Sequence, residues 1–232
     1  MELKQVNEAL NTYIRPQTFP LALKLCASES ELPERVRLPK RDMGFQVTLC
    51  QAIGIARRYR WALAVGKDDQ VCIGGARTMG FLSESAGEPN PKHLEAGKYS
   101  HLLMAPLEIA DFAADVVLIY ASPAQLMRMV QSATRGEAGG VSAVASGFED
   151  CGDVVGRTFQ SDLCQFIMPS GGDRVFGGTQ DHETIFTMPA SKIEAVTNGL
   201  EETHKAGFRY PVLTDLRHQP ALPPFLQIPD NA

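Results

Sequence analysis

The residues with the widest range of chemistry in this sequence are its five cysteines, Cys26, Cys50, Cys72, Cys151 and Cys164. An odd number of cysteines in a chain of 232 residues argues against a disulfide framework. No pair has the CxxC spacing of a zinc ribbon, a thioredoxin site or a bacterial ferredoxin. A metal site would have to be assembled from distant segments. The alternative is that the thiols are small apolar residues of the core.

We expect three of these thiols, Cys50, Cys72 and Cys151, to hold an iron–sulfur cluster, with Cys164 as a fourth ligand, because thiolates are the soft ligands that such clusters require. Three thiolates would leave one iron of a [4Fe–4S] cluster open for a substrate, whereas four favour electron transfer alone. Zinc bound by the same thiolates is an alternative. Glycines near the thiols would let backbone amides approach the sulfurs and tune the reduction potential. These glycines are Gly74, Gly75 and Gly152.

A second candidate site is the segment Gly171-Gly172-Asp173-Arg174. Consecutive amides in a glycine turn can form an anion nest, and Arg174 can clamp a carboxylate or a phosphate. We therefore assign Gly172, Asp173 and Arg174 to a site for a small anionic substrate. Arg77 and Arg157 follow Cys72 and Cys151 at similar distances, which favours a shared anionic ligand. The alternative is a hairpin turn in which Asp173 bonds its own backbone and Arg174 pairs with a surface acid.

Other classes of function find no support in the sequence. The five histidines lack a metal-ligand spacing such as HExxH, and the chain has no GxSxG elbow, Walker loop or GxGxxG motif after a strand. A net charge of −5 without a basic run argues against nucleic acid or an anionic membrane as the main partner. The apolar stretch at 116–121 is too short to span a bilayer, and the first residues do not resemble a secretory signal. We therefore expect a cytoplasmic protein.

The elements that must position these residues alternate between helix and strand, which is typical of a mixed α/β fold. Apolar residues at helical spacing predict helices at 2–15, 46–58, 123–135 and 189–205. Ser122-Pro123 is typical of a helix start. Apolar runs predict strands at 21–25, 61–65, 116–121 and 141–145, and then antiparallel strands at 163–168, 174–176 and 184–188.

We interpret residues 1–232 as one compact domain built from two similar βαβ-type halves, at about 16–82 and 112–206. In this alignment Leu49-Cys50-Gln51-Ala52 corresponds to residues 129–132, and Cys72 corresponds to Cys151. A pseudo-two-fold axis would then bring Cys72 and Cys151 together. A polar strap at 83–111, with one short helix near 93–99, connects the halves. A proline-rich arm at 208–232 extends over the body or over a second subunit.

Four segments, taken in order, resemble a known family: Pro20–Leu25; Cys50-Gln51-Ala52 with Cys72-Ile73-Gly74-Gly75 and Gly80-Phe81; Ala114–Tyr120 with Pro123–Met127; and Gly171–Arg174 with Glu183 and Met188-Pro189. The chain is similar over about residues 16–200 to the uncharacterised archaeal conserved region (ArCR) family, domain of unknown function 169. The resemblance implies an organisation but no settled activity. Members often carry a cysteine where this chain has Ser170, and Asp-Asp-Glu where it has Asp181-His182-Glu183.

From the sequence we expect a cytoplasmic redox protein with an iron–sulfur cluster at the junction of two halves, acting on a small anionic substrate. As an enzyme it would be an iron–sulfur oxidoreductase or a Lewis-acid lyase. We expect a homo-oligomer or a redox partner protein as its partner. The alternative function is a cofactor-free protein that binds a small ligand or another subunit, with structural cysteines.

Overall fold

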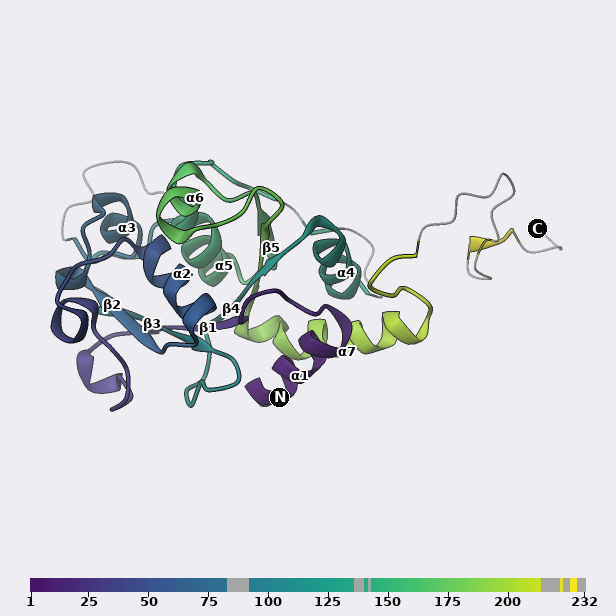
Figure 1. Ribbon diagram of the computed structural model, residues 1–232, viewed down its shortest axis with the longest axis horizontal. Helices are drawn as coiled ribbons and strands as arrows, with labels where there is room; N and C mark the ends of the chain where they lie inside the picture. The colour runs from purple at the N-terminus through teal and green to yellow at the C-terminus, as the bar shows by residue number, and fades with distance from the viewer. Residues whose placement is uncertain (83–91, 136–139, 142, 214–221, 223–225, 229–232) are drawn as a thin grey trace.

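The structure, a computed structural model, describes residues 1–82, 92–135, 140–141, 143–213, 222 and 226–228 (Figure 1). It confirms the mixed α/β fold, with one six-stranded sheet and helices on both faces. The strands are β1 (Leu21–Cys26), β2 (Leu63–Gly66), β3 (His101–Pro106), β4 (Val116–Ala121), β5 (Gln165–Ile167) and β6 (Thr184–Pro189). The helices are α1 (Leu3–Tyr13), α2 (Leu49–Tyr59), α3 (Ile73–Thr78), α4 (Pro123–Ala133), α5 (Arg157–Ser161), α6 (Gly171–Gly177) and α7 (Ile193–Lys205). A π-helical turn, η4 (Cys151–Gly156), precedes α5.

The strand order is β2-β3-β1-β4-β6-β5, and all neighbouring strands are antiparallel. Antiparallel pairing therefore covers the whole sheet and is not confined to strands from the last third of the chain. β1 and β2 run parallel to each other, as a βαβ unit requires, but β3 lies between them, and β6 lies between β4 and β5 in the same way. When β1, β2 and β3 are exchanged for β4, β5 and β6, the same strand order results, read from the other edge of the sheet. An internal duplication would produce this symmetry, and the duplication itself stays a prediction.

The structure changes which parts of the two halves correspond. Residues 141 and 143–145 form no strand, so the second strand of the second half is β5 and not 141–145. The helix after β2 then corresponds to the helix after β5, which pairs Cys72 with Ser170. Both are N-cap residues, and each accepts a hydrogen bond from the third amide of its helix. On the thiol face, α2 lies between β1 and β2 in the sequence, and η4 with α5 lies between β4 and β5. Cys50 at the start of α2 therefore corresponds to Cys151 at the start of η4.

Alternate residues of each strand serve the two faces of the sheet, as strand geometry requires. On one face, which we call the thiol face, helices α2, α3, α5 and α6 cover a core that includes Leu23, Leu102 and Leu118 (Figure 1). On the opposite face, α1, α4 and α7 cover a core that includes Ile119 and Phe186. Over β2 and β3 this opposite face is covered by the segment 32–38 instead.

Local signals in the sequence predicted several elements correctly. Ser122 caps α4, and Pro123 is its first residue. The predicted helices at 2–15 and 189–205 correspond to α1 and α7, whose buried residues include Val6 and Leu10 of α1 and Ile193, Val196 and Leu200 of α7. Within the described residues no helix is both long and apolar enough to cross a bilayer.

Three local predictions were wrong. The strap at 83–111 was expected to be a polar connection with one short helix, but its residues 101–106 form β3, a buried strand that pairs with both β1 and β2. Residues 93–99 form turns and no helix. Residues 174–176 belong to helix α6 and not to a strand. Residues 83–91 and most of the arm at 208–232 lie outside the described residues.

Candidate functional site

Two backbone contacts between distant segments hold the helix starts that carry the thiols next to one another. Val47, just before α2, forms a parallel bridge with Gln70, just before α3, and the Val71 amide donates to the Val47 carbonyl at 3.1 Å. In the other half, the Ser170 amide donates to Asp150 Oδ2 at 2.7 Å. The first contact ties the start of α2 to that of α3, and the second ties the start of η4 to that of α6. Cys50 and Cys72 are thereby neighbours, and Cys151 is next to the segment that contains Ser170.

The two halves are joined at this place by helix packing. Helix α2 crosses α6 so closely that a Cβ added to Gly54 would lie 2.6 Å from the Gly177 carbonyl oxygen. Helix α3 packs against η4, where a Cβ added to Gly152 would lie 3.0 Å from the Thr78 side chain. These contacts connect segments from both halves of the sequence on the thiol face.

Cys50, Cys72 and Cys151 share one electrostatic neighbourhood. Burial raises the pKa of Cys50 far above its ordinary value, and the charges of Asp173 and of the other two thiols raise it further. Burial also raises the pKa of Cys151 to about 12, although bonds from Thr78 and the Gly152 amide act in the opposite direction. Both thiols are therefore protonated near neutral pH when no metal is bound, which disfavours nucleophilic or disulfide-exchange chemistry.

Buried polar atoms without a hydrogen-bond partner among the described residues lie beside these thiols. They are Nε2 and Oε1 of Gln70, two residues before Cys72, and Oδ1 of Asp150, immediately before Cys151. Burial raises the pKa of Asp150 to about 6. An unsatisfied buried polar group costs about 1–3 kcal/mol. The protein therefore leaves hydrogen-bonding capacity free around the thiols, where a bound group or water would use it.

The structure does not bring Cys164 to this place. Its side chain packs against the core of the opposite face, under α1, α4 and α7. Cys26 is buried in the small core beneath the segment 32–38, and burial raises its pKa to about 11. Three of the four predicted ligands are therefore gathered, and the fourth is separated from them by the sheet.

In the part of the chain that the structure describes, no group of three or more His, Cys, Asp or Glu side chains is arranged to hold a metal ion. A single zinc ion needs all its ligand atoms within about 2.3 Å of one point. The thiolates of an iron–sulfur cluster bind separate irons and stand further apart. Among the described residues, Cys50, Cys72 and Cys151 therefore do not stand as the ligand set of a single ion.

The glycines predicted near the thiols differ in what they do. A Cβ on Gly75 would lie 2.7 Å from Gln70 Oε1, and one on Gly152 would lie 3.0 Å from both Lys92 and Thr78. Gly75 and Gly152 therefore allow close packing around the thiols. Gly74 meets no such restriction, because its nearest neighbour would be the Cys72 sulfur at 3.7 Å.

The predicted anion site at residues 171–174 is the start of a helix and not a turn. Gly171 to Arg174 form the first part of α6, and Asp173 is buried, with 1% of its surface exposed. Asp173 accepts hydrogen bonds from the Tyr120 hydroxyl and from Thr179. Arg174 pairs with Asp181 at 3.3 Å on the surface, which is the alternative that the sequence left open.

The other predicted anion ligands occupy separate helices. Arg77 is exposed on α3, and Arg157 begins α5 with its Nε buried and without a partner among the described residues. No geometry links either guanidinium to Gly172 of α6.

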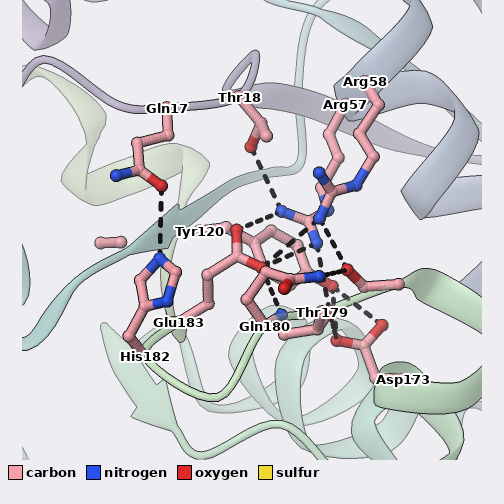
Figure 2. A network of polar contacts seen from close by, with 12 residues as sticks. Gln17, Thr18, Arg57, Arg58, Tyr120, Asp173, Thr179, Gln180, His182 and Glu183 are labelled. Carbon is pink, nitrogen blue, oxygen red and sulfur yellow. Dashed lines mark hydrogen bonds and ion pairs between the residues drawn. The ribbon is translucent and has the colours of Figure 1, made fainter.

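A buried polar network lies behind the thiols (Figure 2). Arg57 of α2 is completely buried and donates to both carboxylate oxygens of Glu183, at 2.6 and 3.1 Å. Its guanidinium stacks on the Tyr120 ring at 3.7 Å, and the Tyr120 hydroxyl donates to Asp173. The network therefore runs from Glu183 through Arg57 and Tyr120 to the carboxylate whose charge acts on Cys50.

Burial and hydrogen bonding together set the ionisation of this network. It raises the pKa of Tyr120 well above the ordinary value and also raises that of Asp173. Burial acts upward on Glu183 too, but the bonds from Arg57 and the Gln180 amide outweigh it, so the pKa of Glu183 is lowered. Sequence reasoning missed the pair because Arg57 and Glu183 are 126 residues apart and each resembles an ordinary surface charge.

Comparisons with known proteins place the chain in a family. It matches the family described as uncharacterised ArCR, domain of unknown function 169, over residues 9–199. The chain belongs to this family, as its sequence segments indicated. It is 25% identical over 205 residues to an uncharacterised protein of Methanocaldococcus jannaschii, MJ0308, in an alignment that covers 78% of this chain and 86% of that protein. No solved structure matches the chain.

Proposed function

We propose that the protein is a cytoplasmic redox protein that binds an iron–sulfur cluster through Cys50, Cys72 and Cys151. The observation that carries the proposal is the meeting of these three thiols, from three helix starts, beside unpartnered polar atoms of Gln70 and Asp150. The positive charge of bound iron would deprotonate the thiols, which offsets the effect of their burial. A bound cluster supplies one-electron transfer.

Three thiolates leave one iron without a cysteine ligand. Ser170 occupies the fourth helix start and is tied to Asp150, the residue before Cys151. The open position would accept the Ser170 hydroxyl or a small anionic substrate. As an enzyme the protein would therefore be an iron–sulfur oxidoreductase or a Lewis-acid lyase.

Exposed apolar side chains border the thiols along the chain. Val71 and Ile73, on either side of Cys72, are each 61% exposed, and Phe148, three residues before Cys151, is 89% exposed. Exposed apolar groups at a functional site favour protein docking. They support a redox partner protein or a second copy of the chain as the partner at this face.

The test is anaerobic purification followed by a visible spectrum and assays for iron and sulfide. We expect a brown protein with stoichiometric iron and sulfide. Substitution of Cys50, Cys72 or Cys151 by Ala should remove the colour and the iron, whereas Cys26→Ala and Cys164→Ala are matched controls that keep both. We expect Ser170→Cys to keep the iron content and to change the electron paramagnetic resonance spectrum, because it adds a fourth thiolate.

A colourless protein without iron, even after anaerobic reconstitution with ferrous iron and sulfide, would contradict the proposal. So would a cluster that survives Cys72→Ala together with Cys151→Ala. One zinc ion per chain, lost in the same variants, would support the zinc alternative instead.

The second candidate is a cofactor-free binding protein with structural cysteines. The raised pKa values of Cys50 and Cys151 favour it, because neutral thiols are what an apolar core requires. In that case Cys72→Ala should cost only about 1 kcal/mol of stability and leave metal content unchanged at zero.

A further inference from the structure

A cavity of about 380 Å³ lies on the opposite face of the sheet from the thiols, over β2 and β3. Its floor is formed by Leu103 and Ala105 of β3, and its walls by segments 33–37, 60–62 and 109–112. Helices α1, α4 and α7 pack on the other half of this face, so the hollow remains where only the segment 32–38 covers the sheet. Pockets of about 300–1,000 Å³ are of the size that small molecules occupy.

The cavity is lined by more positive than negative charge, in a chain whose net charge is −5. Three arginines line it, Arg35, Arg37 and Arg60, against one acidic residue, Asp111. Arg60 is neutralised by an ion pair with Glu108. Among the described residues, neither Arg35 nor Arg37 forms an ion pair, although the charge of Arg37 acts on Asp42. The lining therefore carries two arginines that no close carboxylate neutralises, with Asp111 as its one acidic residue.

Arg37 is held in place before any ligand arrives. Its amide donates to the Ala62 carbonyl at 3.1 Å, and its carbonyl accepts from the Ala64 amide at 3.0 Å, which fixes its backbone against β2. Its guanidinium lies 3.9 Å from the centre of the Trp61 ring. A guanidinium stacked on an aromatic face keeps its N–H donors free in the ring plane, and these donors match a carboxylate or a phosphate.

The rest of the lining is apolar or aromatic. Trp61 and Phe112 are half-buried and present ring surface, while Val36 and Ile109 add aliphatic surface. Asp111 is exposed at the rim, where it repels a second negative group. The lining therefore combines one cationic end with an apolar body and an acidic rim.

We propose that this cavity binds a small organic anion, with a carboxylate or phosphate head on Arg35 and Arg37 and an apolar body against Trp61 and Phe112. The site is independent of the thiols, because it uses the other face of the sheet and none of the residues assigned to the cluster. It gives the protein a ligand-binding function that holds whether or not a cluster is present.

The single tryptophan of the chain, Trp61, lies in the cavity and reports on binding directly. The experiment is a titration of the full-length protein with 3-phenylpropionate and with phenyl phosphate, followed by tryptophan fluorescence and checked by calorimetry. We expect saturable binding of at least one of these anions. Inorganic phosphate should bind more weakly because it lacks the apolar body, and 3-phenylpropanol should bind more weakly because it lacks the charge.

Which of the two probes binds more tightly identifies the head group. We expect Arg35→Gln and Arg37→Gln each to weaken binding roughly tenfold to a hundredfold, because a charge-assisted hydrogen bond is lost. Arg135→Gln, at the exposed end of α4, is the matched control and should leave the dissociation constant unchanged. Circular dichroism of each variant separates loss of binding from loss of folding.

Three results would overturn the proposal. One is the absence of saturable binding of either anion by both methods. Another is equal affinity for 3-phenylpropanol and 3-phenylpropionate, which would show an uncharged apolar pocket. The third is that folded Arg35→Gln and Arg37→Gln proteins bind the anions as well as the wild type does. Loss of the cluster in Cys72→Ala has no bearing on these outcomes, so the two proposals fail separately.

Discussion

Arg57 shows how this protein keeps a full charge inside its core. The guanidinium is shielded from water, and its charge is balanced by Glu183 and by the face of Tyr120. A buried ion pair adds little over a well-packed apolar pair, but removal of one partner leaves an uncompensated charge and is strongly destabilising. The pair therefore fixes the position of α2, and with it the position of Cys50, more than it adds to total stability.

Neutralisation of Glu183 tests this role. We expect Glu183→Gln to lower the free energy of unfolding by about 3–5 kcal/mol at pH 7, measured by urea denaturation. The matched control is Glu201→Gln, which breaks an exposed pair with Lys205 one helical turn away and should cost less than about 1 kcal/mol. Equal stabilities for the two variants would contradict the assignment.

The same variant should change the pH dependence of stability. The pKa of Glu183 in the folded protein lies below its ordinary value. Its contribution is therefore present above the unfolded-state pKa of about 4.3 and is lost as the pH falls through the folded-state pKa. We expect the difference in stability between wild type and Glu183→Gln to be constant from pH 7 to about 5 and to shrink at lower pH.

At the scale of elements, the crossing of α2 and α6 decides whether the thiol segments can meet. Gly54 and Gly177 face each other where the two helices touch, and the Gly177 position is also crowded by Asp173 and by the Cys50 carbonyl. Neither glycine has a positive φ, so the requirement is for space and not for backbone freedom. The absence of side chains at both positions sets the distance between the two helices.

We expect Gly54→Ala to destabilise the protein by about 1–3 kcal/mol, because the new methyl group would meet the Gly177 carbonyl and force the helices apart. Gly171→Ala is the control: it is also a helical glycine, but an added Cβ there meets nothing within 4 Å. It should be neutral or stabilising by up to about 1 kcal/mol. Thermal unfolding of the two variants measures the contrast, and a Gly54→Ala protein as stable as wild type would refute it.

The sequence predicted those elements whose signals are local. The cap and proline at 122–123 and the apolar spacing of the terminal helices depend on neighbouring residues, and these predictions were confirmed. Helix α6 was mistaken for a turn and a strand because Gly171-Gly172 resembles a hairpin turn and Val175-Phe176 resembles a strand. Strand β3 was missed because its apolar run ends in Pro106 after a long polar stretch, and only its pairing with β1 and β2 explains it.

In the candidate site too, features that depend on single residues could be predicted, and features that depend on distant contacts could not. Thiols are visible as residue types, so the sequence could single out Cys50, Cys72 and Cys151 as candidates, and their role as ligands stays a prediction. The separation of Cys164 could not be foreseen, since it depends on which face of β5 and of the preceding turn the side chain occupies. The Arg57–Glu183 pair and the cavity around Arg37 likewise depend on contacts between distant segments.

At the scale of the whole molecule, the two halves share their cores. The thiol-face core includes Leu49 and Leu102 from the first half and Leu118 and Ile185 from the second. β1 pairs with β4 across the middle of the sheet, though through only three residue pairs, against six on the outer side of each strand. Each half alone would expose the apolar surface that the other half covers.

We therefore expect fragments 1–111 and 112–232, separated in the loop between β3 and β4, to be unfolded when expressed singly. Their mixture, or their co-expression, should restore a complex with the circular dichroism spectrum and cooperative unfolding of the intact chain. Gel filtration and chemical denaturation measure this. A fragment 1–111 that unfolds cooperatively by itself would show two separate domains, contrary to the single domain predicted from the sequence.

The packing of α1 against α7 has a consequence for how the protein is made. The inward residues of α1, Val6 and Leu10, and its C-cap residue Ile14 are covered by a core to which α7 contributes Ile193, Val196 and Leu200. A ribosome adds about 5–20 residues per second, so the first helix emerges about 10 to 40 seconds before its partner exists. Throughout that interval its apolar stripe is open to chaperones, and the native fold closes only when the last helix has left the exit tunnel.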